Sequence, residues 1–143
     1  MTWRIAPITD PTEQDREAIL APLRAYNIAQ AGDPRIRPVV LSVIDEAGQT
    51  AGGLWGRLGY DWMFIELLVV PEAARGSGIG RQLMAMAEVR AREDNCVGIW
   101  LDTYAFQARG FYEKLGFSLF GTIDDYPRGH QRFFMQKRLT TPD

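Results

Sequence analysis

The chain has little of the two residues that most often build disulfides and metal sites. Its 143 residues include one cysteine, Cys96, and one histidine, His130. A single cysteine cannot form a disulfide within the chain, and two side chains are too few ligands for a structural zinc ion. A chain of this length can bury roughly two-thirds of its unfolded surface, so it needs neither to fold. We therefore predict no metal site.

The sequence also lacks an excess of charge of one sign and any long hydrophobic run. Its 16 basic and 18 acidic residues leave a formal net charge of −2, which gives no electrostatic reason to expect nucleic-acid binding. No apolar run approaches the roughly 18–20 residues that span a bilayer. Residues 1–4 lack the basic-then-apolar pattern of a signal peptide. We expect a cytoplasmic protein with no nucleic-acid or membrane partner.

Hydrophobic periodicity and turn residues divide the sequence into alternating strands and helices, without repeats or linkers. Period-two and continuous apolar patterns predict strands over residues 2–8, 39–43, 50–60, 62–70, 97–101, 117–123 and 132–137. Helical spacing predicts helices over residues 11–31, about 79–92, and 107–115. This order predicts one α/β domain over residues 1–143, with a central mixed sheet flanked by helices.

A glycine-rich loop joins the apolar strand ending at Val70 to the next helix. The loop reads Arg75-Gly76-Ser77-Gly78-Ile79-Gly80. Helix N-termini carry unpaired N–H groups and the positive end of the helix dipole, so they attract phosphate, and glycines allow close backbone approach. The pattern predicts a pyrophosphate on these amides, with Arg75 adding a charged contact. A turn that only packs the helix onto the sheet is the alternative.

Two other phosphate-binding motifs fit this loop less well. A P-loop requires Gly-Lys followed by serine or threonine, but Gly80 is followed by Arg81. A dinucleotide fingerprint requires glycines at one-then-two spacing inside an opening βαβ unit, whereas Gly76, Gly78 and Gly80 alternate. These two cofactor classes are therefore disfavoured.

Two motifs in order resemble the GNAT superfamily of N-acetyltransferases. The first resembles that superfamily's coenzyme A motif and reads Glu66-x-Leu68-x-Val70-Pro71, then Arg75-x-x-Gly78-x-Gly80 opening a helix. The second resembles its closing helix-to-strand motif and reads Phe111-Tyr112-Glu113-Lys114-Leu115-Gly116-Phe117. The resemblance extends over about residues 3–139. It implies a GNAT-like fold and an acetyl-CoA-dependent N-acetyltransferase.

The resemblance also implies where acetyl-CoA binds. Two strands would splay apart around the pantetheine arm, which would pair with backbone groups as an added strand does. The implied cofactor-binding residues are Leu68, Val69, Val70, Arg75, Gly76, Ser77, Gly78, Ile79, Gly80, Gln107 and Tyr112. Many relatives carry an arm-binding asparagine seven residues before this tyrosine, where the chain has Ala105. Thr103 or Gln107 could replace it.

Direct acetyl transfer to an amine requires a neutral nucleophile and a proton for the departing thiolate. The resemblance places Tyr112 near the thioester sulfur, and a phenol with a pKa of about 10 is protonated at neutral pH, so Tyr112 is the candidate acid. Glu66 is the only charged residue in residues 63–70. Burial on a strand would raise the pKa of this carboxyl, so Glu66 is the candidate base, directly or through water. A packing tyrosine and a solvated or arginine-paired glutamate are the alternatives.

The acceptor side is less defined by the sequence. Four aromatic residues could line an acceptor pocket or only pack in the sheet: Trp55, Tyr60, Trp62 and Tyr104. Four polar residues fall in a loop that borders the acceptor cleft in related folds or forms a solvated turn: Asp124, Asp125, Arg128 and His130. We predict acetylation of a small-molecule primary amine. A protein or peptide amine, and a coenzyme A-binding module without turnover, are the alternatives.

The last predicted strand suggests the oligomeric state. It carries three large apolar residues in a row, Phe133, Phe134 and Met135. Such a run could pair two copies of the chain or belong to a buried strand. We predict a homodimer.

Overall fold

The computed structural model describes residues 1–140. By its internal contacts the chain divides into two compact units, Met1–Pro34 and Arg35–Asp143. The first contains one helix, α1 (Glu13–Ala31).

Helix α1 begins after Thr12 because the Asp15 N–H donates to Thr12 Oγ1 (3.3 Å) and the Thr12 N–H donates to Asp15 Oδ2 (2.8 Å). Residues 2–8 form no strand, so that prediction is wrong. A strand needs backbone partners on a neighbouring strand, and this unit has none.

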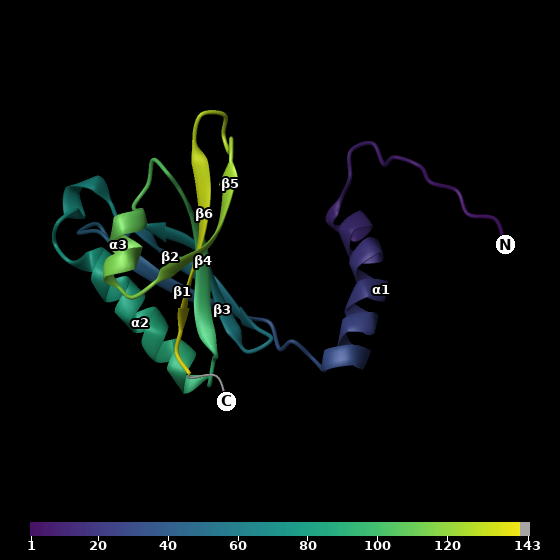
Figure 1. The fold of residues 1–143 in the computed structure, drawn as a ribbon, viewed down its shortest axis with the longest axis horizontal. Coiled ribbons are helices and arrows are strands. Elements are labelled where there is room, and N and C mark those ends of the chain that lie inside the picture. Colours follow the sequence, from purple (N-terminus) through teal and green to yellow (C-terminus); the bar gives the residue numbers. More distant parts are fainter. Residues whose placement is uncertain (141–143) are drawn as a thin grey trace. The chain divides into compact units, whose positions relative to one another are not determined.

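The second unit is built on a six-stranded mixed sheet (Figure 1). Its strands are β1 (Arg37–Ile44), β2 (Thr50–Gly59), β3 (Trp62–Val69), β4 (Gly98–Tyr104), β5 (Ser118–Asp124) and β6 (Gln131–Arg138). The order across the sheet is β1-β2-β3-β4-β6-β5. Only the β3–β4 pair is parallel, and the other four pairs are antiparallel. This confirms the predicted mixed sheet.

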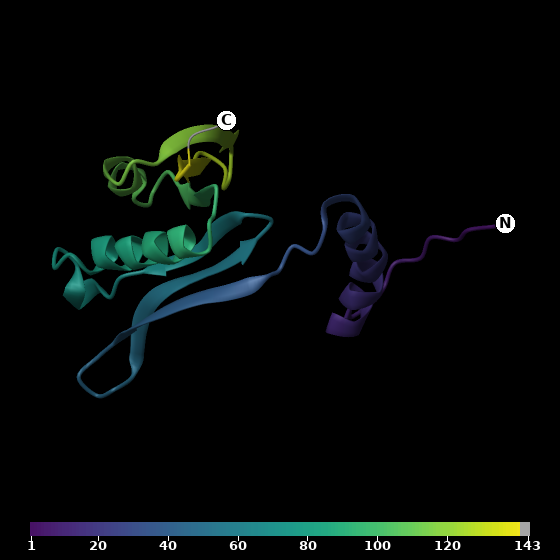
Figure 2. The same cartoon turned by 90° about the horizontal axis from the view of Figure 1, so that it is seen from below.

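Two helices pack on this sheet, α2 (Ile79–Glu93) and α3 (Arg109–Lys114). A short 3-10 turn, η1 (Glu72–Ala74), precedes α2. Alternate strand residues and one face of each helix share a single buried core. Its members include Leu58, Met63, Ile65, Leu83, Ala87, Ile99, Leu101, Tyr112, Phe117 and Met135. Figure 2 shows α2 lying along the strands of the N-terminal half of the sheet. Every predicted element of this unit forms within three residues of its predicted ends.

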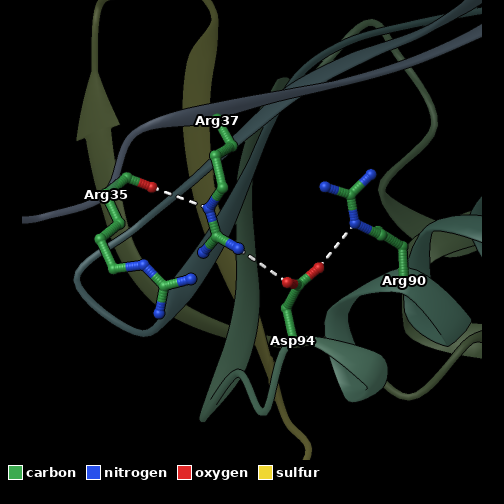
Figure 3. Close-up of polar contacts among 4 residues, drawn as sticks. All are labelled: Arg35, Arg37, Arg90 and Asp94. Atoms are coloured by element: carbon green, nitrogen blue, oxygen red, sulfur yellow. Dashed lines mark hydrogen bonds and ion pairs between the residues drawn. The ribbon is translucent and has the colours of Figure 1, made fainter.

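An ion-pair network fixes the C-terminal end of α2 to β1 (Figure 3). Asp94 caps α2 and accepts from Arg90 Nε (2.6 Å) and from Arg37 Nη1 (2.7 Å). Arg37 Nε also donates to the Arg35 carbonyl oxygen (2.9 Å). The hydrogen bond from Arg90, followed by the one from Arg37, lowers the pKa of Asp94. The C-terminal end of α2 is therefore anchored to the first strand of the sheet.

Strands β3 and β4 separate after a short paired stretch. They pair only from Trp62 with Gly98 to Ile65 with Leu101, although both continue beyond that point. On its other edge β3 has a β-bulge: Gly56 pairs with Ile65 and Trp55 pairs with Leu67, which leaves Glu66 as the extra residue. The splayed strands implied by the resemblance are confirmed.

The last strand lies inside the sheet, not at its edge. β6 pairs with β4 on one side and with β5 on the other. Phe133 is 7% exposed and Met135 is fully buried. The apolar run that suggested a homodimer therefore belongs to the core of its own chain, and the outer strand on this side is β5. Among residues 1–140, no helix is long and apolar enough to cross a bilayer.

Candidate functional site

A cavity of about 880 Å³ opens where β3 and β4 separate. Its walls are the end of β3, the loop and first turn of α2, the end of β4, and α3. We call it the main cavity. It is lined by eleven of the residues singled out in the sequence: Glu66, Leu68, Val69, Val70, Arg75, Gly76, Gly78, Ile79, Gly80, Gln107 and Tyr112. The fold therefore brings these residues together from four separate segments of the chain.

The loop before α2 leaves the helix N-terminus without a side-chain cap. Gly78 is the N-cap residue, no side chain accepts from the first turn, and that turn has no acidic residue. Gly76 and Gly78 adopt φ values of +81° and +89°, which a residue with a Cβ rarely adopts. No atom lies within 4 Å of where a Cβ would stand at either glycine. Arg75 and Arg81 line the cavity beside them. This is a site suited to an anion.

Ser77 and Gly80 have structural roles in this loop. The Ser77 N–H donates to the Ala74 carbonyl oxygen (3.2 Å), and the Ser77 hydroxyl donates to the same oxygen. Ser77 does not line the main cavity. A Cβ at Gly80 would stand 3.3 Å from both Phe111 Cζ and Val70 Cγ2, so this glycine lets α2 pack closely against α3 and the end of β3.

Tyr112 is a buried polar side chain in the wall of the main cavity. It lies on α3, is 9% exposed, and contacts Phe111 and Phe117 edge to face. Burial and, secondarily, the negative charge of Asp102 raise the pKa of Tyr112 to about 12. The phenol therefore stays protonated at neutral pH.

Glu66 is exposed, so the prediction that this carboxylate is buried is wrong. The bulge explains the difference, because it interrupts the alternation of the two faces of β3 at that residue. Glu66 nevertheless lines the main cavity.

Gln107 is oriented by two hydrogen bonds to its side-chain oxygen. Gln107 Oε1 accepts from the Tyr104 N–H (2.8 Å) and from Thr103 Oγ1 (3.1 Å). Its amide nitrogen, which can donate two hydrogen bonds, is left for another partner. Thr103 is buried, whereas Ala105 is exposed and does not line the cavity. Both Thr103 and Gln107 line the main cavity.

Asp102 and Phe106 also line the main cavity, and the sequence reasoning missed both. Asp102 Oδ1 accepts from Arg132 Nε (3.0 Å) and lies 2.9 Å from Arg132 Nη2. A lone carboxylate near the end of an apolar strand, the pattern that identified Glu66, was the signal available for Asp102. Phe106 gave none, since an aromatic residue in a loop has many roles.

The four aromatic residues that could line an acceptor pocket or pack in the sheet do not form one cluster. Trp55, Tyr60 and Trp62 line neither the main cavity nor a second, smaller cavity that is described below. Trp62 lies opposite Gly98, and Tyr104 is six residues farther along β4, about 20 Å away at strand spacing. The Tyr104 ring instead contacts a ring of the β5–β6 loop. Within residues 1–140, no cluster of three or more His, Cys, Asp and Glu side chains could hold a metal ion.

The chain is similar to known acetyltransferases in sequence and in structure. A profile described as the acetyltransferase (GNAT) family matches residues 2–117. The chain is 36% identical over 133 residues to Acetyltransferase Atu2258 of Agrobacterium fabrum, which covers 92% of this chain and 97% of that protein. It is 44% identical over 95 residues to Blasticidin-S acetyltransferase of Streptomyces morookaense. That match covers 66% of this chain and 70% of that protein. The crystal structure of an acetyltransferase from Bacillus cereus aligns with a TM-score of 0.82 at 33% identity. The alignment covers 94% of this chain and 98% of that one.

Proposed function

The chain belongs to the acetyltransferase (GNAT) family, and we propose that it transfers an acetyl group directly to a primary amine of a small molecule. As a member of this family, the protein has the GNAT fold and is an acetyl-CoA-dependent N-acetyltransferase. The observation that carries the proposal is the main cavity, which brings the uncapped N-terminus of α2 and the protonated Tyr112 into one space.

The residues of the main cavity fit acetyl-CoA. Beyond Ile65, β3 has no partner on its β4 side, so backbone groups of Leu68, Val69 and Val70 are available to amides of the pantetheine arm. The uncapped N-terminus of α2 would hold the pyrophosphate, with Arg75 and the open space at the loop glycines. Ser77 would act by holding the loop in shape. The Gln107 amide would bind the arm near its reactive end.

Acetyl-CoA supplies a thioester whose carbonyl carbon accepts the amine. As the nitrogen–carbon bond forms and the carbon–sulfur bond breaks, the nitrogen must lose a proton and the sulfur must gain one. A thiol has an ordinary pKa of about 8.5. Complete proton transfer from a phenol whose pKa is about 12 to such a sulfur is therefore unfavourable. We infer that Tyr112 donates a hydrogen bond to the sulfur as its charge develops, and that a proton from solvent finally neutralises the thiolate, which balances the proton lost by the amine.

Glu66 is the proposed acceptor of that amine proton, directly or through one water. Its exposed carboxylate lines the cavity next to Ile65, where β3 leaves β4. An exposed base can exchange its proton with solvent after each turnover. Proximity of the two reactants supplies the remaining rate enhancement.

The small-molecule acceptor is supported by a relative whose name specifies blasticidin S. We further propose that residues 1–143 act as one catalytic domain, because the family match at residues 2–117 crosses the boundary between the two structural units. A cytoplasmic location stays a prediction from the sequence.

The test is release of coenzyme A thiol from acetyl-CoA with a panel of amines, amino acids and peptides. We expect amine-dependent release with small amines and none in Tyr112→Phe above about 1% of wild type. Preferred turnover of peptides would shift the proposal to a peptide amine. Binding of coenzyme A without release by any acceptor would identify a binding module.

A further inference from the structure

A second, smaller cavity of about 540 Å³ adjoins the main one. It is lined by Tyr104, Phe106, Asp125, Tyr126 and Pro127, and we call it the aromatic hollow. Phe106 lines both cavities, so the two share a wall. The hollow lies between the end of β4 and the β5–β6 loop, whose residues the proposed mechanism does not use.

The hollow is walled by three aromatic rings, two of which are stacked on each other. The Tyr104 and Phe106 rings lie 5.2 Å apart and are nearly parallel, at 4°. Tyr126 lies 5.7 Å from Tyr104 at 39°. Phe106 is 59% exposed and Tyr126 is 41% exposed, so these rings offer apolar faces to a ligand. Such faces favour planar rings and cations.

The rings are held in place by groups behind them. The Arg132 guanidinium lies 4.8 Å from the Tyr126 ring and 5.6 Å from the Tyr104 ring, and Asp102 fixes it by two contacts. The loop is closed by hydrogen bonds from the Tyr126 N–H to the His130 carbonyl (3.2 Å) and from the His130 N–H to the Pro127 carbonyl (2.9 Å). A hollow preformed in this way loses little entropy on binding.

The charge of the hollow is negative. The Arg132 charge is neutralised by Asp102. Asp125 accepts one hydrogen bond, from the Gly129 N–H (3.3 Å), and no ion pair found within residues 1–140 involves it. Its exposed carboxylate therefore favours a cationic ligand.

We propose that the aromatic hollow binds the body of the acceptor, and that the acceptor is a planar aromatic or heteroaromatic amine carrying a second positive group. This inference rests on the proposed acetyl transfer. The ring would stack on the exposed faces of Phe106 and Tyr126, and its positive group would face Asp125. The amine to be acetylated would pass Phe106 into the main cavity.

Three matched amines test the chemistry: 1,4-bis(aminomethyl)benzene, its cyclohexane counterpart, which lacks the aromatic face, and 4-methylbenzylamine, which lacks the second charge. Isothermal titration into protein saturated with coenzyme A measures binding without turnover. We expect the aromatic diamine to bind about tenfold more tightly than either comparison amine. Tyr126→Leu should abolish the preference over cyclohexane, and Asp125→Asn the preference over the monoamine. Trp55→Leu, an exposed aromatic outside both cavities, should leave both preferences unchanged.

Equal binding of the aromatic and cyclohexane diamines by the wild type would overturn the inference, as would a preference that survives in Tyr126→Leu. A coenzyme A-induced rise in melting temperature in each variant shows that it is folded. Kinetics with acetyl-CoA separate this inference from the proposed function. Turnover of all three amines at equal kcat/KM contradicts the aromatic site alone. Preferential binding without turnover supports the hollow and contradicts acetyl transfer.

Discussion

Asp102 and Tyr112 both line the main cavity, and the charge of the Asp102 carboxylate adds to burial in raising the pKa of the Tyr112 phenol to about 12. The carboxylate is itself paired with Arg132, which stands behind the aromatic hollow. The group proposed to bind the sulfur and the rings proposed to bind the acceptor are thus linked through one ion pair.

Replacing Tyr112 by phenylalanine should lower kcat by about 100-fold, the loss of a hydrogen bond to a developing charge. The ring and its packing against Phe111 and Phe117 remain, so coenzyme A affinity should change less than about twofold. Steady-state kinetics and calorimetry measure the two quantities. Tyr60→Phe, outside both cavities, is the control. If Tyr112→Phe keeps more than half of the wild-type kcat with chemistry rate-limiting, Tyr112 does not act on the sulfur.

Glu66→Gln should lower kcat/KM for the amine by about tenfold. This loss is small for a general base because the carboxylate is exposed and water can take its place. Coenzyme A affinity should be unchanged. Glu46→Gln, in the β1–β2 turn, is the matched exposed control. Wild-type kcat/KM in Glu66→Gln would leave proton removal to solvent.

Gly78→Val should weaken coenzyme A binding by at least tenfold, because a branched side chain would enter the space next to the α2 N-terminus. Any side chain at φ +89° is also strained, so a control must carry the same strain. Gly48→Val provides it: Gly48 has φ +80° with equally open surroundings, in a turn away from the cavity. Equal loss of coenzyme A affinity in both variants would remove the phosphate site.

Alkaline pH should destabilise the wild type through Tyr112. The pKa is raised in the folded state, so between about pH 10 and 12 the unfolded chain loses this proton while the folded protein keeps it. Stability should fall by about 1.4 kcal/mol per pH unit in that window from this group alone, and the fall should be smaller in Tyr112→Phe. Urea unfolding at pH 9, 10 and 11 measures the difference. Parallel pH curves for both proteins would contradict burial of the phenol.

The predicted homodimer needs a surface other than β6, which lies inside the sheet. The outer strand β5 exposes Leu119, Phe120 and Ile123. If copies pair there, light scattering should give twice the mass of one chain, and Phe120→Lys should reduce it to one. A wild-type mass of one chain at micromolar concentration would rule out a stable dimer.

Local sequence determined the elements of the second unit and the loop before α2. Glycines at positions 76 and 78 adopt positive φ, and apolar spacing sets the buried stripe of the helix, so both are decided within a few residues. Tyr112 was recognisable for the same reason, since the motif that contains it is contiguous. Residues 2–8 show the limit, because a strand pattern without a partner strand forms no strand.

Tertiary structure decided what pairing across the sheet creates. The bulge that exposes Glu66 exists only in the register of β3 against β2, and the main cavity exists only because β3 and β4 stop pairing at Ile65 and Leu101. Asp102 and Arg132 are 30 residues apart in sequence and meet only because β6 inserts beside β4. No local pattern encodes such contacts, since strand neighbours are selected by the packing of the whole core.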